Sequence, residues 1–546
     1  MSLGYFNYPL PANEPVLGYA PGSAERKALS KALADAKKKK LEIPMYIGGR
    51  AVKTGKKVEI RPPHELSHTL GFFHRGDDKH INQAIDAALK AKSSWEAMPW
   101  EDRAHIFLKA ADLIAQKYRA ELNAATMLCQ SKNAYQAEID SACELIDFLR
   151  FNVHFLSKIY RQQPSDSPGV KNRTEWRPLE GFVLALTPFN FTAIAGNLPT
   201  SAALCGNVVV WKPADTQVYS AQLIMKILKE AGLPDGVINL VYVSGQKLGK
   251  IVFSHPDFAG IHFTGSSAVF NTIWKTIGEN INRYKSYPRI VGETGGKDFV
   301  VIHKSANIDE AVTALARGAF EYQGQKCSAA SRAYIPSNLA DRIKTKLINT
   351  VKSFKMGPVD DFSNFINAVI DEKSFDKISN YLKNAAKDRK ASILVGGNCD
   401  KTEGYFVEPT IIEAKDPKYV TMCEEIFGPV LTIYVYDADK FEQTLDLVDS
   451  TSPYALTGSI LAQDRQAIAL ATERLRFSAG NFYVNDKPTG AVVGQQPFGG
   501  ARASGTNDKA GSALNLYRWL SARSIKETLN PPVDYTYPFL AKDAEQ

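Results

Sequence analysis

The 546-residue chain lacks a long hydrophobic run, a low-complexity tract and any CxxC pair. Without about 20 consecutive apolar residues, it is predicted to have no transmembrane helix. Its six cysteines are scattered, which in a chain of this length indicates reduced thiols and no disulfide framework, and we predict no metal site. The N-terminus shows neither an apolar signal core nor an Arg- and Ser-rich amphipathic stretch. We therefore predict a cytoplasmic protein, with the mitochondrial matrix as the alternative for a eukaryotic source.

The chain also lacks a strong charge imbalance, because 66 basic residues face 58 acidic ones and the formal net charge is +8. The one basic cluster is Lys37–Lys40. Such a cluster is either a contact for nucleic acid or membrane, or a solvated helix end. Because charges of both signs alternate elsewhere, the helix end is favoured, and neither a nucleic acid nor a membrane is predicted as a partner.

The length exceeds what one hydrophobic core supports, so two or three packed units are expected. Helical periodicity covers 78–98, 101–128 and 136–160, and 161–181 is predicted to be a connector or a β-ribbon. Short apolar strands then alternate with helices such as 221–233, 267–281 and 339–354. The strands are expected at 181–187, 207–213, 237–243 and 260–265, then at 299–303, 331–336, 392–397 and 430–436. This alternation predicts an α/β fold with parallel sheets covered on both faces.

The loops that follow the first strands are the expected ligand positions, since ligands bind at the carboxyl ends of parallel strands. A helix that begins at Gly265 and Ser266 offers free N–H groups to a pyrophosphate. Lys212 and Asp215, just past their strand, could hold ribose hydroxyls. The dinucleotide fingerprint GxGxxG is absent. A helix start and polar residues at strand ends can occur in any α/β protein, so they do not by themselves identify a dinucleotide site.

Three further residues could carry chemistry, and each has an ordinary structural alternative. Cys327 could be an apolar filler or a nucleophile, and Glu293 a solvated loop residue or the base that activates water for hydrolysis of a thioester. Asn190 could satisfy its own loop or donate to a developing oxyanion. From the residues alone, these alternatives stay open.

Six motifs together resemble the NAD(P)-dependent aldehyde dehydrogenase superfamily over nearly the whole chain. They are PFNF (188–191), KPAD (212–215), FTGS (263–266), GETGGKD (292–298), FEYQGQKCSAASR (320–332) and EEIFGPV (424–430). The resemblance implies a Rossmann-type NAD-binding domain, an α/β catalytic domain and a small β oligomerisation arm. The implied boundaries are 1–165 with 181–298 for the first, 299–510 for the second, and 166–180 with 511–546 for the arm and C-terminal tail.

The resemblance also implies roles for the three candidate residues. Cys327 is the nucleophile that forms a thiohemiacetal and then a thioester. The Asn190 amide and the Cys327 backbone N–H hold the oxyanion. Glu293 deprotonates the water that cleaves the thioester.

The cofactor residues follow in the same way, and the implied cofactor is NAD. The adenosine and pyrophosphate contacts match Thr187, Lys212 and Asp215 with Gly265, Ser266, Ser267, Ala268 and Val269. The nicotinamide contacts match Glu425 and Phe427. Because Asp215 would repel a 2′-phosphate, NAD is expected to be preferred over NADP.

The segment 484–511, with FLRFN (148–152) and TPFNFTAIAGNLP (187–199), resembles the Δ1-pyrroline-5-carboxylate dehydrogenase subfamily. Its members oxidise L-glutamate γ-semialdehyde to L-glutamate in proline breakdown. The resemblance implies a small-molecule substrate bound by Ser328, Gly490, Ala491 and Phe191, with an ion pair of Glu144 and Lys326 nearby. It also implies a homodimer or a dimer of dimers. A dehydrogenase for another semialdehyde, such as succinate semialdehyde, and an inactive basic binding protein are the alternatives.

Overall fold

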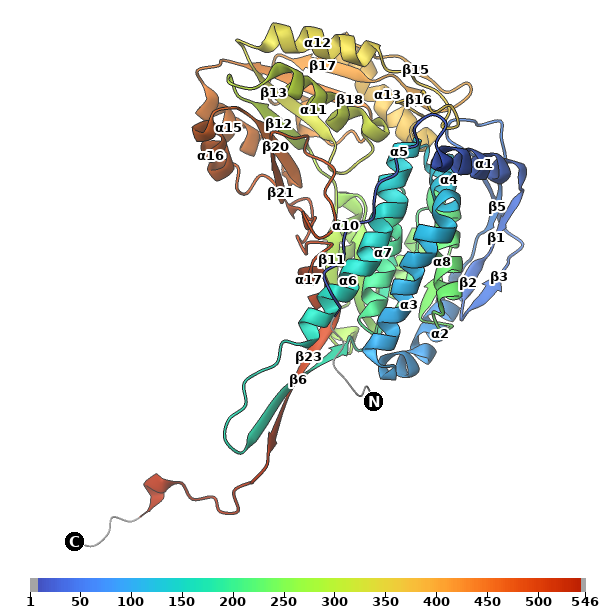
Figure 1. The fold of residues 1–546 in the computed structure, drawn as a ribbon, viewed down its shortest axis with the longest axis vertical. Coiled ribbons are helices and arrows are strands. Elements are labelled where there is room, and N and C mark those ends of the chain that lie inside the picture. The colour runs from blue at the N-terminus through green and yellow to red at the C-terminus, as the bar shows by residue number, and fades with distance from the viewer. Residues whose placement is uncertain (1–7, 542–546) are drawn as a thin grey trace, which may run out of the picture.

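The computed structural model describes residues 8–541 and contains two seven-stranded sheets (Figure 1). The first sheet has the order β11-β10-β7-β8-β9-β2-β3. Its strands β11 to β9 pair in parallel, and β2 adds to β9 in antiparallel orientation. The strands are β2 (Met45–Ile47), β3 (Arg50–Val52), β7 (Phe182–Leu186), β8 (Val208–Lys212), β9 (Ile238–Leu240), β10 (Phe258–Thr264) and β11 (Arg289–Glu293). Strands β7 to β10 are almost wholly buried, as expected for a sheet covered on both faces.

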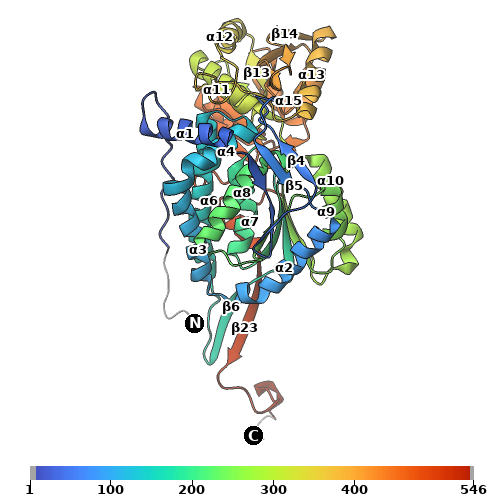
Figure 2. The ribbon, with the colours of Figure 1, turned by 90° about the vertical axis from the view of Figure 1, so that its right-hand side faces the viewer.

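Helices cover both faces of this sheet (Figure 2). One layer contains α3 (Trp100–Leu113), α6 (Glu144–Tyr160), α7 (Thr192–Leu204) and α8 (Val218–Ala231), with α4 (Arg119–Gln130) beside it. The other contains α2 (Asp78–Ala97), α9 (Gly245–Val252) and α10 (Ser267–Glu279). The helices predicted over 101–128 and 136–160 are each interrupted by a π-helical turn, at Ile114–Tyr118 and Glu138–Cys143. Such turns insert one residue into the helical ladder without ending the helix, so periodicity alone misses them.

The second sheet has the order β14-β17-β18-β13-β12-β20-β21 and is parallel except for the pair β14–β17. Its strands are β12 (Asp298–Ile302), β13 (Ala330–Pro336), β14 (Ala391–Val395), β17 (Thr410–Ala414), β18 (Val430–Tyr436), β20 (Thr457–Leu461) and β21 (Asn481–Val484). Helices α11 (Ile308–Phe320) and α12 (Ala340–Lys352) belong to one hydrophobic cluster on it. Helices α13 (Glu372–Lys387), α15 (Phe441–Ser450) and α16 (Arg465–Arg474) belong to the other. The predicted α/β class, with parallel sheets covered on both faces, is confirmed.

A two-stranded ribbon projects away from both sheets (Figure 1). It pairs β6 (Val170–Pro178) with β23 (Leu520–Thr528) in antiparallel register. The segment 161–181 is therefore a β-ribbon strand rather than a plain connector. The predicted domain boundaries stay a prediction, but both strands lie inside the ranges assigned to the arm and tail.

Some strands differ from the sequence prediction. The strand expected at 237–243 covers only Ile238–Leu240. Strands β11, β17, β20 and β21 were missed, because they are short and contain glycine, charged or hydroxyl residues among the apolar ones. The cluster Lys37–Lys40 begins in the last turn of α1 (Ala24–Lys38), where cations complement the helix dipole. No helix of residues 8–541 is long and apolar enough to cross a membrane.

Candidate active site

The cysteine loop (Glu321–Ser328) joins the end of α11 to β13 through an unusual backbone turn. Tyr322, Gln323 and Gly324 have φ angles of 51°, 53° and 64°, all in the left-handed region. A Cβ on Gly324 would lie 2.1 Å from the Gly428 carbonyl oxygen, so glycine is required there. Left-handed non-glycine residues persist where their surroundings hold them. Here Gln323 Nε2 donates to the carbonyls of Ser131 and Ala368, at 3.0 and 2.8 Å.

This turn brings Cys327 to the end of β11, where Glu293 lies. Cys327 Sγ is 3.7 Å from Glu293 Oε1, and the thiol residue is 8% exposed. Burial raises the pKa of Glu293 to about 7. Burial also raises the pKa of the Cys327 thiol well above its usual value, and the carboxylates of Glu293, Asp298 and Glu425 raise it further. The pair therefore rests as a neutral thiol beside a carboxylate that can take its proton.

Asn190 approaches the same loop from the first sheet. It lies in the turn between β7 and α7, is 4% exposed, and donates from Nδ2 to the Gln325 carbonyl at 3.0 Å. An amide nitrogen carries two N–H groups, so one stays available to another acceptor. The structure thus brings together Cys327, Glu293 and Asn190, which lie in three separate parts of the sequence.

The helix start predicted to bind a pyrophosphate is present at the carboxyl end of β10. Ser266 caps α10, and its hydroxyl accepts from the Val269 N–H at 3.4 Å. Ser267 Oγ donates to the Ala503 carbonyl at 3.3 Å. Gly265 N–H donates to the Glu293 carbonyl at 3.1 Å, which ties this turn to the strand that carries Glu293. Ala268 follows in the first turn of the helix.

The residues predicted to hold adenosine lie at the ends of β7 and β8. The Thr187 hydroxyl accepts from Trp211 Nε1 at 3.0 Å. Lys212 Nζ lies 3.8 Å from Asp215 Oδ1, while Arg75 Nη2 contacts Asp215 Oδ2 at 2.6 Å. The carboxylate expected to repel a 2′-phosphate is therefore flanked by two cations. Arg75 lies 140 positions earlier in the chain, and only the fold shows this pairing.

The predicted nicotinamide contacts lie beside the thiol. Glu425, Phe427 and Cys327 line one small pocket together with Gly296. Glu425 Oε1 accepts from the Gly296 N–H at 2.9 Å, and burial raises the pKa of this carboxyl group. Phe427 has a left-handed φ of 61°, and its ring packs edge-on against Phe189 at 5.8 Å.

The substrate residues predicted near the C-terminal end surround the cysteine loop from another side. Ser328 and Thr489 share a hydrogen bond of 2.8 Å between their hydroxyl oxygens. Thr489 was not predicted, although it directly precedes Gly490. Gly490 has a φ of 96°, which favours glycine, and Ala491 is half-buried. Phe191 directly follows Asn190, so it lies on the same turn.

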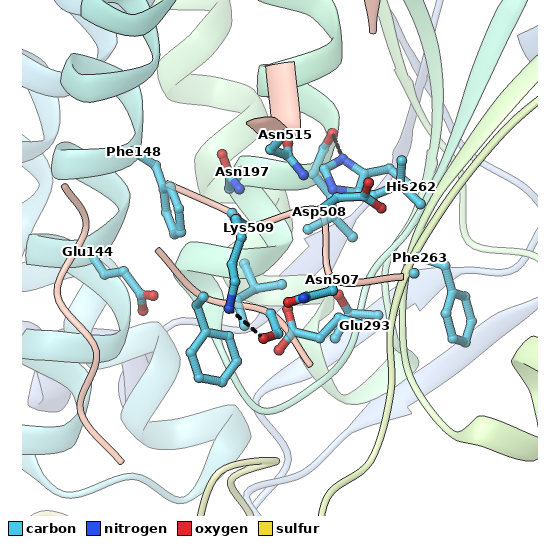
Figure 3. A pocket seen from close by; sticks show the side chains of 18 residues that line it. Glu144, Phe148, Asn197, His262, Phe263, Glu293, Asn507, Asp508, Lys509 and Asn515 are labelled. Atoms are coloured by element: carbon cyan, nitrogen blue, oxygen red, sulfur yellow. Dashed lines mark hydrogen bonds between the residues drawn. The ribbon is translucent and has the colours of Figure 1, made fainter. Parts of the chain in front are cut away.

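The predicted ion pair of Glu144 with Lys326 is wrong. Lys326 Nζ lies 3.7 Å from Asp140 and 3.5 Å from Glu321 instead. Glu144 lines a pocket behind Glu293, which also contains Lys509 (Figure 3). Burial and the Asp140 carboxylate raise the pKa of Glu144. Sequence position could not distinguish Asp140 from Glu144, because both precede or begin α6 within one turn.

Residues 51–525 match the aldehyde dehydrogenase family. The chain belongs to the aldehyde dehydrogenase family. It is 53% identical over 537 residues to the mitochondrial Δ1-pyrroline-5-carboxylate dehydrogenase of Dictyostelium discoideum, which covers 98% of this chain and 96% of that protein. The mitochondrial enzyme of the same name from Homo sapiens is 49% identical over 97% of this chain and 94% of that protein.

Solved structures agree with this membership. A crystal structure of the Δ-pyrroline-5-carboxylate dehydrogenase from Mycobacterium tuberculosis bound with NAD superimposes with a TM-score of 0.96. It is 51% identical, and the match covers 99% of this chain and all of that one. The predicted family and fold are thus confirmed.

The Asp215 carboxylate of this aldehyde dehydrogenase indicates whether the residues present suit a dinucleotide. Asp215 Oδ1 is shielded from solvent and accepts no hydrogen bond from any described residue. An acceptor without a donor, at the carboxyl end of β8, suits a ribose hydroxyl. No group of three or more His, Cys, Asp and Glu side chains within residues 8–541 is arranged to hold a metal ion.

Proposed function

We propose that this aldehyde dehydrogenase oxidises L-glutamate γ-semialdehyde, the open form of Δ1-pyrroline-5-carboxylate, to L-glutamate with NAD. The reaction is the second step of proline breakdown. The names of relatives at about half identity over nearly the whole chain support the substrate. The observation that carries the chemistry is the 3.7 Å contact between Cys327 Sγ and Glu293 Oε1, with Asn190 attached to the same loop.

The proposed reaction begins with transfer of the Cys327 thiol proton to Glu293. The thiolate then attacks the aldehyde carbon, and the oxyanion accepts hydrogen bonds from the free Asn190 N–H and the Cys327 backbone N–H. Bound NAD supplies the acceptor for the hydride that leaves this carbon. Cys327 is left as a thioester of the substrate.

Glu293 then acts a second time. It releases the thiol proton to solvent, which a pKa of about 7 permits at neutral pH. It next removes a proton from water, which attacks the thioester and frees L-glutamate and the Cys327 thiol. One carboxylate thus serves both halves of the cycle.

Cofactor binding is assigned to the three strand ends described above. Thr187, Lys212 and Asp215 would hold the adenosine, and the turn from Gly265 through Val269 the pyrophosphate. Glu425 and Phe427 would contact the nicotinamide side. Since Arg75 and Lys212 flank Asp215, the preference for NAD over NADP depends on how firmly this carboxylate stays paired.

The substrate carboxylate is assigned to Ser328 with the backbone N–H groups of Gly490 and Ala491. Within residues 8–541 neither N–H donates to another protein group. Unpaired backbone N–H groups suit an anion without placing a cation near the thiol. Phe191 would pack against the aliphatic part, and Glu144 and Lys326 stay predicted as nearby polar residues.

A homodimer or a dimer of dimers is proposed for the assembly. The β6–β23 ribbon extends away from both sheets (Figure 1). The segment after it exposes large apolar side chains. Leu529, Tyr535 and Phe539 are 63%, 86% and 80% exposed. Exposed apolar patches of this kind mark contact surfaces. The compartment, cytoplasm or mitochondrial matrix, stays a prediction.

The test is a comparison of aldehydes and cofactors. Purified protein is mixed with NAD or NADP and either Δ1-pyrroline-5-carboxylate or succinate semialdehyde, and reduced nicotinamide is followed by absorbance. We expect the highest kcat/KM with Δ1-pyrroline-5-carboxylate and NAD. A higher value with succinate semialdehyde would support the other dehydrogenase. No turnover of either aldehyde, with salt-sensitive RNA binding, would support the binding protein.

A further inference from the structure

Lys132 is a fully buried lysine that the proposed chemistry does not use. It lies in the turn between α4 and α5 (Ala134–Ala137), and its Nζ is 2.7 Å from Asp140 Oδ2. The same Nζ lies 4.2 Å from the centroid of the Phe191 ring and 4.3 Å from that of Tyr322. An ammonium between two ring faces is attracted by both, and most strongly where water is excluded.

The two rings belong to the two loops that carry the candidate catalytic groups. Phe191 directly follows Asn190 on the turn after β7, in the first sheet. Tyr322 begins the left-handed turn of the cysteine loop, which enters β13 of the second sheet. A single side chain thus contacts the turn that carries the amide donor and the loop that carries the thiol.

The backbone beside Lys132 is tied to the same loop. The Ser131 carbonyl accepts from Gln323 Nε2 of that loop. On the other side of Lys132, Asn133 Nδ2 donates to the carbonyl of Phe365, outside the loop, at 3.3 Å. Burial lowers the pKa of Lys132 to about 8, with the Asp140 carboxylate opposing this shift, so the side chain is mainly charged at neutral pH. The Lys132 turn is therefore fixed independently of its own side chain.

We propose that Lys132 is a positioning residue that holds the Asn190 turn and the cysteine loop in register. Through the two rings, it keeps the Asn190 N–H and the Cys327 thiol directed at the same aldehyde carbonyl. This inference rests on the proposed function. It predicts energetic coupling between Lys132, which acts through the two rings, and Asn190, which donates to the substrate oxyanion.

The central test is a double-mutant cycle of Lys132→Met and Asn190→Ala. Misplacing reacting groups by about 1 Å can cost on the order of 10²-fold in rate. We expect Lys132→Met to lower kcat by about that factor while the dissociation constant of NAD changes less than about twofold. Asn190→Ala should then cost at least about fivefold less in the Lys132→Met background than in the parent protein. Equal costs in both backgrounds would overturn the proposal, because a purely structural lysine predicts additive losses.

Two further variants guard against misfolding, since removal of Lys132 leaves Asp140 without its nearest cation. Tyr322→Phe keeps the ring under the ammonium, whereas Tyr322→Leu removes it. We expect the leucine variant to have at least about fivefold lower kcat than the phenylalanine variant. Equal kcat values would contradict the proposal even if Lys132→Met did not fold.

A matched control is Lys229→Met. Lys229 lies in the last turn of α8, and its Nζ also lies over an aromatic ring, 5.5 Å from the centroid of Tyr46. This variant should leave kcat unchanged.

Alkylation of Cys327 by iodoacetamide, measured by peptide mass spectrometry, needs no aldehyde and so stays informative if the proposed substrate is wrong. Release of the loop should raise the alkylation rate at least about fivefold in Lys132→Met. An unchanged rate would count against the proposal, whereas failure to oxidise the semialdehyde would count against the proposed function alone.

Discussion

The molecule contains two buried groups of charged side chains that differ in how their charges are balanced. Around Cys327, the carboxyl groups of Glu293, Asp298 and Glu425 have no ion-pair partner among residues 8–541. Around Lys132, the two ammonium groups of Lys132 and Lys326 face the carboxylates of Asp140 and Glu321. Asp298 and the four side chains around Lys132 are buried, whereas Glu293 and Glu425 are partly exposed.

The difference shows in the pKa values. Burial raises the pKa of Glu293 to about 7 and that of Asp298 to about 8, because Lys509 and Arg332 offset only part of the effect of lost water. Ion pairs with Asp140 and Glu321 instead raise the pKa of Lys326 against the effect of burial. Burial also lowers the pKa of Lys132 to about 8, but Lys132 and Lys326 stay mainly charged at neutral pH and are proposed to support the reacting loops. Glu293, with a pKa of about 7, can exchange protons there.

The largest effect is expected from removing the thiol at the centre of the unbalanced group. Cys327→Ala should abolish turnover, because no other group can form the covalent intermediate. NAD binding should stay within about twofold, since the strand ends at β7, β8 and β10 are unaltered. Steady-state kinetics and NAD titration provide the measurement. Turnover near that of the parent protein would refute the role of Cys327.

The next effect concerns the base. Glu293→Gln should lower kcat by about 10²- to 10⁴-fold, the usual contribution of a general base. In the parent protein, kcat should fall as the pH drops below about 7, because Glu293 is then protonated.

Glu293 also affects stability. Its pKa is raised in the folded state, so its ionisation opposes folding as the pH rises above the pKa of this group in the unfolded chain. Glu293→Gln should therefore keep or increase the melting temperature. A destabilised variant with normal kcat would contradict this view of the pair.

Removing a charge from the balanced group around Lys132 should instead lower stability. Asp140→Ala leaves Lys132 and Lys326 without their shared carboxylate and should lower the free energy of unfolding by about 3 to 5 kcal/mol. Urea unfolding provides the measurement. A loss below about 1 kcal/mol would mean that the cluster is not the support described here.

The smallest effect is expected from an exposed ion pair on the ribbon. Arg173 Nη1 lies 2.9 Å from Glu527 Oε2, but both side chains are about half exposed. Arg173→Ala should change the free energy of unfolding by less than about 1 kcal/mol. The same urea measurement, beside Asp140→Ala, separates buried from exposed pairs. A loss comparable to that of Asp140→Ala would show that the ribbon pair is shielded by a second subunit.

The sequence predicted the residues of the candidate site better than it predicted the contacts of the buried Lys132 cluster. Glu293 ends a strand, and Cys327 and Asn190 lie in loops beside strands; parallel sheets bring such positions to one edge. Lys132 could not be found in this way, because its partners are ring faces 59 and 190 positions later in the chain (191 − 132 and 322 − 132). The Glu144–Lys326 pair was wrong because Asp140, on the preceding π-helical turn, takes that position. Contacts between distant segments depend on tertiary packing, which local patterns do not encode.

The most direct test of the account uses the Glu293→Gln variant with NAD and Δ1-pyrroline-5-carboxylate, followed by intact and peptide mass spectrometry. We predict that about one equivalent of reduced nicotinamide forms, more slowly than in the parent protein because the thiol must lose its proton to solvent instead of Glu293. A γ-glutamyl thioester should then accumulate on Cys327, because hydrolysis needs a base to activate water and is slowed more than attack. Steady turnover with unmodified Cys327, or an adduct on any of the other five cysteines, would contradict the pairing of this thiol with Glu293.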